Sequence, residues 1–261
     1  MLIYQAKVKP FAKMVRLLAK HCMQQPSIFI RTFMALYILA TMAACSKTIN
    51  TSTPVLVNTN DTAKSYLALG DSYTIGENVS ETERFPAQTV ALLRQQNVQV
   101  KNPTYIATTG WTTTNLLGAI SNQNITQSYD IVSLLIGVND QYQRVDTAVY
   151  RQQFIRCLEK AIELSGNRIS RVFVLSIPDY SVTPFVSSSN KPIVKQQIDW
   201  FNAINKQETL RKNVSYIDIT PSSREGATNP SLIASDGLHP SGLEYKKWAM
   251  MLAPLLKTAL Q

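Results

Sequence analysis

The chain contains a serine, a histidine and an aspartate whose types and spacing could support nucleophilic attack on an ester. A serine hydroxyl is a poor nucleophile until a base accepts its proton. Ser72 lies in the turn-forming sequence Gly70-Asp71-Ser72, and His239 is the only histidine after residue 45. Asp236 precedes His239 closely enough for a turn to bring its carboxylate to the second ring nitrogen and fix the tautomer of the base. These residues predict a Ser-His-Asp triad.

Turn-forming segments also contain candidate hydrogen-bond donors for the oxyanion that forms during ester hydrolysis. Attack on an ester carbonyl creates an oxyanion that needs about two or three converging donors, each worth ~3 kcal/mol of barrier. The backbone N–H groups of Ser72 and Gly110 and the side-chain amide of Asn139 could supply them. A glycine at position 110 would let a substrate approach the backbone closely. Each segment can also be explained as ordinary turn chemistry, but their order along the chain favours a single site.

Aromatic residues near these segments are candidates for the wall of a substrate pocket. One follows the glycine directly, one follows the asparagine, and two lie in a loop after an apolar run. Packing in the core or within the loop is an equally good interpretation for three of them, all except the tyrosine at position 142. The four candidates are Trp111, Tyr142, Tyr180 and Phe185.

Apolar runs and helical stripes alternate along the chain and must position these residues. Strands are predicted at Tyr66–Leu69, Tyr105–Ala107, Ile131–Ile136, Val172–Ile177 and Val214–Ile219, with a further short strand conceivable at Val98–Val100. Helices are predicted at Phe85–Gln96, Thr112–Ala119, Ala148–Leu164, Ile193–Glu208 and Gly242–Leu260.

This alternation predicts crossover connections and a parallel sheet. The strands are nearly continuous apolar runs, which indicates that helices cover both faces of the sheet. We therefore expect one three-layer α/β/α domain over residues 64–261. In such folds a site lies at the carboxyl ends of the strands, where the polar segments described above are found.

Four sequence blocks together resemble the GDSL, or SGNH, hydrolase family over most of residues 64–261. They are Gly70-Asp71-Ser72, Gly110, Gly137-x-Asn139-Asp140 and Asp236-x-x-His239. The resemblance implies that Ser72 is the nucleophile, that Asp236 and His239 complete the triad, and that Gly110 and Asn139 contribute to the oxyanion hole. It also implies a flavodoxin-like sheet with the strand order 2-1-3-4-5. Tyr73 stands where the family motif has leucine.

The nucleophile elbow of the α/β-hydrolases gives a competing interpretation that the sequence excludes. That elbow reads G-x-S-x-G, whereas residues 70–74 read GDSYT and lack the final glycine. We therefore expect a serine esterase that hydrolyses a small-molecule, glycan or lipid ester through an acyl-enzyme. An acyltransferase using the same triad and a surface binding module without turnover are the alternatives. Short-chain esters, O-acetylated polysaccharide and lysophospholipid all stay open as substrates.

The net charge of +9 does not indicate a nucleic-acid partner. Six of the 26 basic residues and none of the 17 acidic ones fall within residues 1–45, so 20 basic residues face 17 acidic ones in the rest. No basic stripe with interleaved aromatic residues is present in that remainder, and we expect no binding to nucleic acid.

The first 45 residues resemble an export signal. A basic segment precedes the uncharged apolar run Phe33–Ala44, which is too short to span a bilayer. The sequence Met42-Ala43-Ala44-Cys45 resembles a bacterial lipobox, with methionine at the position that usually holds leucine. We therefore predict a signal peptide at residues 1–44, lipidation of Cys45, and a flexible tether within residues 45–63.

This interpretation places the protein outside the cytoplasm, as a lipoprotein anchored on the periplasmic or cell-surface face of a membrane. An ordinary signal peptide and a secreted protein are the alternative. The region before the apolar run is long, so Met14 or Met23 is a candidate for the true start.

Few metal ligands are left once the signal is removed. His239 is then the only histidine, and Cys157 is the only cysteine besides Cys45. Zinc and other transition-metal sites built from these residue types are not expected, although a carboxylate site for Ca²⁺ or Mg²⁺ stays open. We expect no cofactor, a monomer, and a buried packing role for Cys157.

Overall fold

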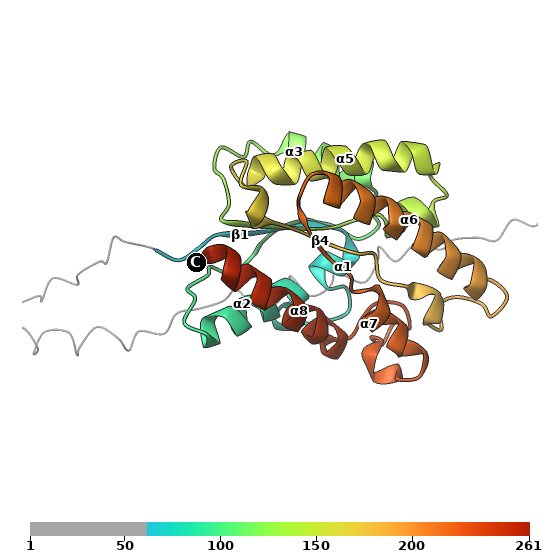
Figure 1. The fold of residues 1–261 in the computed structure, drawn as a ribbon. Coiled ribbons are helices and arrows are strands. Elements are labelled where there is room, and N and C mark those ends of the chain that lie inside the picture. The colour runs from blue at the N-terminus through green and yellow to red at the C-terminus, as the bar shows by residue number, and fades with distance from the viewer. Residues whose placement is uncertain (1–61) are drawn as a thin grey trace, which may run out of the picture. The chain divides into compact units, whose positions relative to one another are not determined.

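The computed structural model describes residues 62–261 (Figure 1). The predicted signal peptide, the lipidation of Cys45 and nearly all of the tether lie outside the described residues and stay predictions. Within residues 62–261 no helix is both long enough and apolar enough to cross a membrane.

A parallel sheet of five strands forms the middle layer of the domain, with the strand order β2-β1-β3-β4-β5. This confirms the order 2-1-3-4-5 that the family resemblance implies. The three central strands are buried along their whole length, as their continuous apolar sequences predict. The strands are β1 Tyr66–Gly70, β2 Thr104–Ala107, β3 Ile131–Leu135, β4 Val172–Leu175 and β5 Ser215–Ile217.

Several predicted strand bounds and one predicted strand differ from the structure. Strand β5 is shorter at both ends than the predicted Val214–Ile219, and β3 ends one residue before Ile136. The segment Val98–Val100 is not a strand, because only Val100 pairs, in an isolated bridge with Lys64. Strand β4 ends two residues earlier than the apolar run Val172–Ile177 suggests. The N–H of Ser176 still donates to the carbonyl oxygen of Ile217 in β5, at 2.9 Å. The N–H of Ile177 donates instead to the side chain of Asn202, on a helix, so pairing with the neighbouring strand stops there.

Helices cover both faces of the sheet (Figure 1). Helices α3, α5 and α6 lie on one face, and α2 and α8 lie side by side on the other. The α-helices are α1 Ser72–Ile75, α2 Phe85–Gln95, α3 Thr113–Asn122, α4 Val138–Tyr142, α5 Thr147–Leu164, α6 Lys191–Arg211, α7 Thr220–Arg224 and α8 Gly242–Leu260. Short 3₁₀ turns are η1 Glu81–Glu83, η2 Ile169–Arg171, η3 Tyr180–Val182, η4 Glu225–Ala227 and η5 Pro230–Leu232.

Aromatic side chains fill the core between the sheet and each helical layer. On one face the ring of Trp248 packs edge-on against Tyr245, with centroids 5.0 Å apart. On the other face Tyr150 stacks on Phe201 at 4.4 Å. Cys157 is a fully buried free thiol on α5, which confirms its predicted packing role. Burial raises the pKa of this thiol, so it stays a neutral packing group.

Candidate active site

Ser72, His239 and Asp236 form a continuous chain of polar contacts at the carboxyl end of β1. The hydroxyl Oγ of Ser72 lies 3.0 Å from Nε2 of His239. The other ring nitrogen, Nδ1, lies 2.5 Å from Oδ2 of Asp236. When Nδ1 carries the proton and donates to the carboxylate, Nε2 is free to accept a proton from the serine. The structure thus brings the three residues of the predicted triad together.

The turn from β1 into α1 fixes the position of Ser72. A side chain at Gly70 would place its Cβ 2.1 Å from Oγ1 of Thr74 and 2.3 Å from the carbonyl oxygen of Leu135, so only glycine fits there. Asp71 then caps α1, because its side-chain oxygen Oδ1 accepts a hydrogen bond of 3.0 Å from the N–H of Tyr73. Ser72 is therefore the first residue of a helix that starts directly from a buried strand.

A tight turn presents the base and its partner. Oδ1 of Asp236 accepts hydrogen bonds of 3.0 Å from the N–H groups of both Leu238 and His239. Gly237 between them has the left-handed φ of +71° that the turn requires. Partial burial raises the pKa of Asp236, but the hydrogen bonds from the His239 ring and from the two N–H groups outweigh it and hold the pKa below its usual range. The carboxylate therefore stays charged beside the imidazole.

Asn139 enters the site from the turn after β3. Gly137 takes a φ of +127° in this turn, and a Cβ there would lie 2.3 Å from the hydroxyl of Tyr150. The next residue but one, Asn139, donates from Nδ2 to the carbonyl oxygen of Trp111 over 3.0 Å. A side-chain amide has two N–H groups, so the contact with Trp111 orients Asn139 and uses one of them.

The neighbouring Asp140 holds the turn after β3 against the start of α3. Its two carboxylate oxygens accept from the N–H of Thr113 at 2.9 Å and from the hydroxyl of Thr113 at 2.6 Å. This contact places Asn139 beside the loop that contains Gly110. Gly110 itself has a φ of +81°, and the space where a side chain would lie is open. The left-handed backbone conformation at position 110, rather than a lack of space for a side chain, therefore favours glycine there.

A cavity of about 160 Å³ opens beside the Ser72 hydroxyl. Three of the four predicted substrate residues, Tyr142, Tyr180 and Phe185, line it. Trp111 does not line this cavity. Its side chain is partly buried and packs against the hydrophobic core. Its backbone carbonyl, rather than its ring, contributes to the site through Asn139. The full lining consists of Ser72, Tyr73, Val138, Asn139, Tyr142, Tyr180, Phe185, Leu238 and His239.

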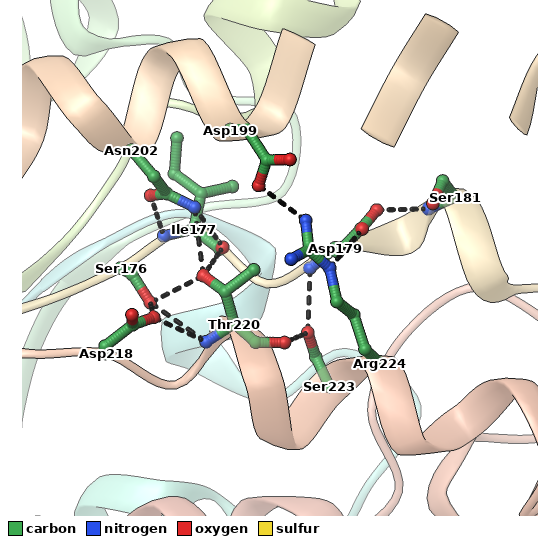
Figure 2. A network of polar contacts seen from close by, with 10 residues as sticks. All are labelled: Ser176, Ile177, Asp179, Ser181, Asp199, Asn202, Asp218, Thr220, Ser223 and Arg224. Carbon is green, nitrogen blue, oxygen red and sulfur yellow. Dashed lines mark hydrogen bonds and ion pairs between the residues drawn. The ribbon is translucent and has the colours of Figure 1, made fainter. Parts of the chain in front are cut away.

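An ion pair between a buried carboxylate and a half-buried arginine holds the loop that supplies Tyr180 and Phe185 (Figure 2). Asp179 follows β4, and its buried carboxylate accepts from Nε of Arg224 at 2.8 Å and from the N–H of Ser181 at 2.9 Å. The loop also pairs with the turn of the base, since the N–H of Phe185 donates to the carbonyl oxygen of Gly237 at 3.2 Å. The aromatic wall and His239 are therefore anchored to each other.

Several contacts of the site were not predicted from the sequence. Val138 and Leu238 line the cavity, and the ring of Tyr73 packs edge-on against His239 with centroids 5.5 Å apart. Asn78 donates from Nδ2 to Oδ2 of Asp236 over 2.6 Å. Each of Val138, Leu238 and Tyr73 is adjacent in sequence to a predicted site residue, and this adjacency could have indicated that they belong to the site. Asn78 had none, since it lies 158 positions from its partner.

Within the part of the chain that the structure describes, no group of three or more His, Cys, Asp or Glu side chains is arranged to hold a metal ion.

Replacement of Asp71 by asparagine is expected to stabilise the protein at alkaline pH. Burial raises the pKa of Asp71 from 3.8 to about 8, and Asp140 adds to the shift. The folded protein therefore holds this proton more tightly than the unfolded chain does. The resulting stability is complete below about pH 4 and is lost as the pH rises through 8. Asparagine keeps an oxygen for the N–H of Tyr73 and cannot ionise.

Thermal unfolding of both proteins between pH 5 and pH 9 is the measurement. We expect the Tm of Asp71→Asn relative to that of the wild type to increase by about 4 °C or more between pH 5 and pH 9. Asp146→Asn is the control, because Asp146 also caps a helix but is exposed. A pH-independent difference between wild type and Asp71→Asn would contradict this account, because it would show that the folded protein holds the Asp71 proton no more tightly than the unfolded chain does.

Solved structures with the same fold include several esterases and lipases. A lipase/acylhydrolase from Enterococcus faecalis has a TM-score of 0.59 and 18% identity, with 75% of this chain and 96% of that chain covered. The acetylxylan esterase Axe2 from Geobacillus stearothermophilus has a TM-score of 0.55 and 19% identity, with 76% and 94% covered. A member of the lipolytic G-D-S-L family from Veillonella parvula has a TM-score of 0.53 and 18% identity, with 76% and 96% covered. No curated protein sequence matches the chain.

At these identities the structural neighbours establish the fold, and the family assignment rests on a sequence model. Residues 68–247, more than half of the 261-residue chain, match the model of the GDSL-like lipase/acylhydrolase family. The matched segment contains Ser72, Asn139, Asp236 and His239. The chain is thus an ester-hydrolysing serine hydrolase that belongs to the GDSL-like lipase/acylhydrolase family.

Proposed function

We propose that Ser72, His239 and Asp236 are the catalytic triad of this esterase and that the reaction passes through an acyl-enzyme. The observation that carries the proposal is the pair of contacts at His239, 3.0 Å to the Ser72 hydroxyl and 2.5 Å to the Asp236 carboxylate. Hydrogen-bond distances of this kind are what proton transfer from a serine nucleophile requires.

The first half-reaction forms the acyl-enzyme. Oγ of Ser72 bonds to the carbonyl carbon of the ester while its proton passes to Nε2 of His239. The bond between that carbon and the alcohol oxygen then breaks, and the leaving alcohol takes the proton from His239. Asp236, charged and hydrogen-bonded to Nδ1, stabilises the imidazolium between these two steps.

The second half-reaction returns the enzyme to its starting state. His239 takes a proton from a water molecule while the water oxygen bonds to the acyl carbon. The bond to Oγ of Ser72 breaks, the serine regains its proton from His239, and the carboxylic acid leaves. No other reactant is needed.

The oxyanion of both steps is stabilised by three donors in this account. Ser72 is the first residue of α1, and the first N–H groups of a helix have no partner within it. The second amide N–H of Asn139 and the N–H of Gly110 complete the set. Donors held in place before the reaction starts do not reorganise during it, which makes them effective.

We further propose that the preferred substrates carry short acyl groups. The cavity beside Ser72 has a volume of about 160 Å³, and a cavity of about 150 Å³ is known to hold a molecule of the size of benzene. An acyl chain of about six carbons or fewer fits such a space. Acetyl esters of sugars are among the candidates, because Axe2, which shares the fold, is an acetylxylan esterase and because two exposed aromatic rings, Tyr142 and Phe185, border the cavity.

A series of nitrophenyl esters of increasing chain length, assayed beside acetylated oligosaccharides, tests the substrate class. We expect kcat/KM to be highest for acetyl to butyryl esters and to fall by about tenfold or more for the octanoyl ester. Phe185→Ala removes part of the cavity wall and is expected to reduce this discrimination. Trp200→Ala is the control, since Trp200 is similarly exposed but lies on α6 outside the cavity. A wild-type preference for octanoyl over acetyl esters would contradict a short-chain substrate.

A further inference from the structure

Asn78 hydrogen-bonds to the carboxylate of the proposed triad from outside the cavity. Its Nδ2 lies 2.6 Å from Oδ2 of Asp236, the same oxygen that receives Nδ1 of His239 at 2.5 Å. The other oxygen, Oδ1, accepts two backbone N–H groups at 3.0 Å. A carboxylate offers about four acceptor positions, so all of those on Asp236 are in use and its orientation is fully determined.

The segment that carries Asn78 starts at the nucleophile. Helix α1 runs from Ser72 to Ile75, and Gly76, with a left-handed φ of +65°, terminates it. The next N–H, that of Glu77, donates to the carbonyl oxygen of Ser72 at 3.0 Å. Asn78 follows with a left-handed φ of +60°. Any movement of this short segment is therefore coupled to the backbone of Ser72.

Glu77 connects the same segment to the loop of the oxyanion hole. Its carboxylate accepts a hydrogen bond from the hydroxyl of Thr109, which immediately precedes Gly110. Residues 77 and 78 thus contact two other loops of the site, one through each side chain. One loop contains Gly110 and the other contains Asp236 and His239.

We propose that Asn78 is a positioning residue of the triad, which holds the Asp236 carboxylate in line with His239 and fixes that turn to the segment of the nucleophile. The inference rests on the proposed roles of Ser72, Asp236 and His239. A hydrogen bond to a charged group is stronger than one between neutral groups, which suits a contact at the protein surface.

The chemistry of asparagine fits this position better than that of the other donors. Its amide is neutral, so it orients the carboxylate without cancelling the negative charge that stabilises the imidazolium of His239. Asparagine also tolerates the left-handed conformation that most side chains avoid. Lysine or arginine would add a positive charge beside the imidazolium, and serine would be too short to keep the contact.

The direct test compares two glycine variants. Asn78→Gly removes the amide and keeps the left-handed backbone without strain. Asn97→Gly is the matched control, because Asn97 has nearly the same φ of +63° but follows α2 and lies outside the cavity. We expect Asn78→Gly to lower kcat about tenfold or more with little change in KM and Tm. Asn97→Gly is expected to leave all three unchanged.

The pH profile supplies a second measurement that a plain turn residue would not affect. Asn78→Asp keeps a residue that tolerates the turn and places a negative charge against Asp236. This charge favours the imidazolium of His239, so the pH at which kcat/KM is half-maximal is expected to rise. The comparison is made at constant ionic strength. The other titratable groups around His239 and Asp236 are common to both proteins and are Asp71, Tyr73, Glu77, Asp179, Tyr180, Glu244 and Tyr245.

Wild-type kcat in Asn78→Gly together with a wild-type pH profile in Asn78→Asp would overturn the inference. A fall in kcat with an upward shift of the profile would support it. Ser72→Ala, assayed in parallel, separates the inference from the proposal on which it rests. If that variant is inactive and both Asn78 variants are normal, only the role of Asn78 fails. If that variant is active, the triad itself fails, and the inference with it.

Discussion

Ser72→Ala is expected to reduce ester turnover by about 10³-fold or more while leaving the fold and the Tm unchanged. The side-chain hydroxyl of Ser72 acts as the nucleophile in the proposed reaction, since the covalent bond to the acyl group forms at Oγ. The backbone N–H that we assign to the oxyanion hole is retained in the variant. Residual activity above the uncatalysed rate is therefore expected, because binding and the oxyanion donors continue to act.

Steady-state kinetics on a short-chain nitrophenyl ester, with thermal unfolding of the same samples, measure this effect. Ser181→Ala is a suitable control, because Ser181 is also buried and lies in the neighbouring loop, but does not line the cavity. It is expected to keep nearly the full wild-type rate. Normal turnover by a well-folded Ser72→Ala protein would refute the assignment of the nucleophile.

Asn139→Ala is expected to lower kcat by about 10²–10³-fold, by analogy with the removal of one side-chain donor from an oxyanion hole. The lost N–H acts on charge that develops only in the transition state, so kcat falls more than KM rises. Asn139→Asp is expected to be at least as damaging. The new carboxylate would face both the developing oxyanion and the carbonyl oxygen of Trp111, to which the amide now donates at 3.0 Å.

The two variants are assayed together, with thermal unfolding to detect any loss of folding. A residue that only forms the turn after β3 would tolerate either replacement with a small change in Tm and a nearly normal kcat. That outcome would remove Asn139 from the oxyanion hole and leave the backbone donors of Ser72 and Gly110. A large fall in kcat with an unchanged Tm is the result that we expect.

The sheet could be predicted because each central strand lies in a short, mostly apolar run that a glycine or a proline ends. Helix α8 begins and ends where its amphipathic pattern predicts, at Gly242 and Leu260. The segment Val98–Val100 was harder, because a short apolar run does not distinguish a strand from a loop that makes a single bridge. The end of β4 depended on Asn202, a residue of α6, and no local pattern reveals that contact.

Some residues of the candidate site could likewise be predicted from local sequence, and others could not. Ser72, Asn139 and His239 follow apolar runs or a recognisable turn, and parallel topology brings such segments to one edge of the sheet. Whether an aromatic ring lines the cavity or packs in the core depends on side-chain direction, which separates Tyr180 and Phe185 from Trp111. The contact from Asn78 depends on the folded path of two loops and leaves no trace in the sequence.

Covalent labelling tests the central claim, that Ser72 is the activated nucleophile, most directly. A fluorophosphonate forms a bond between its phosphorus and an activated serine oxygen as fluoride leaves, and intact-mass and peptide mass spectrometry locate the adduct. The account predicts one label per chain, on Ser72, with little labelling of His239→Ala because the base that accepts the proton is missing. An active wild-type protein that stays unlabelled, or that carries its label on another residue, would contradict it.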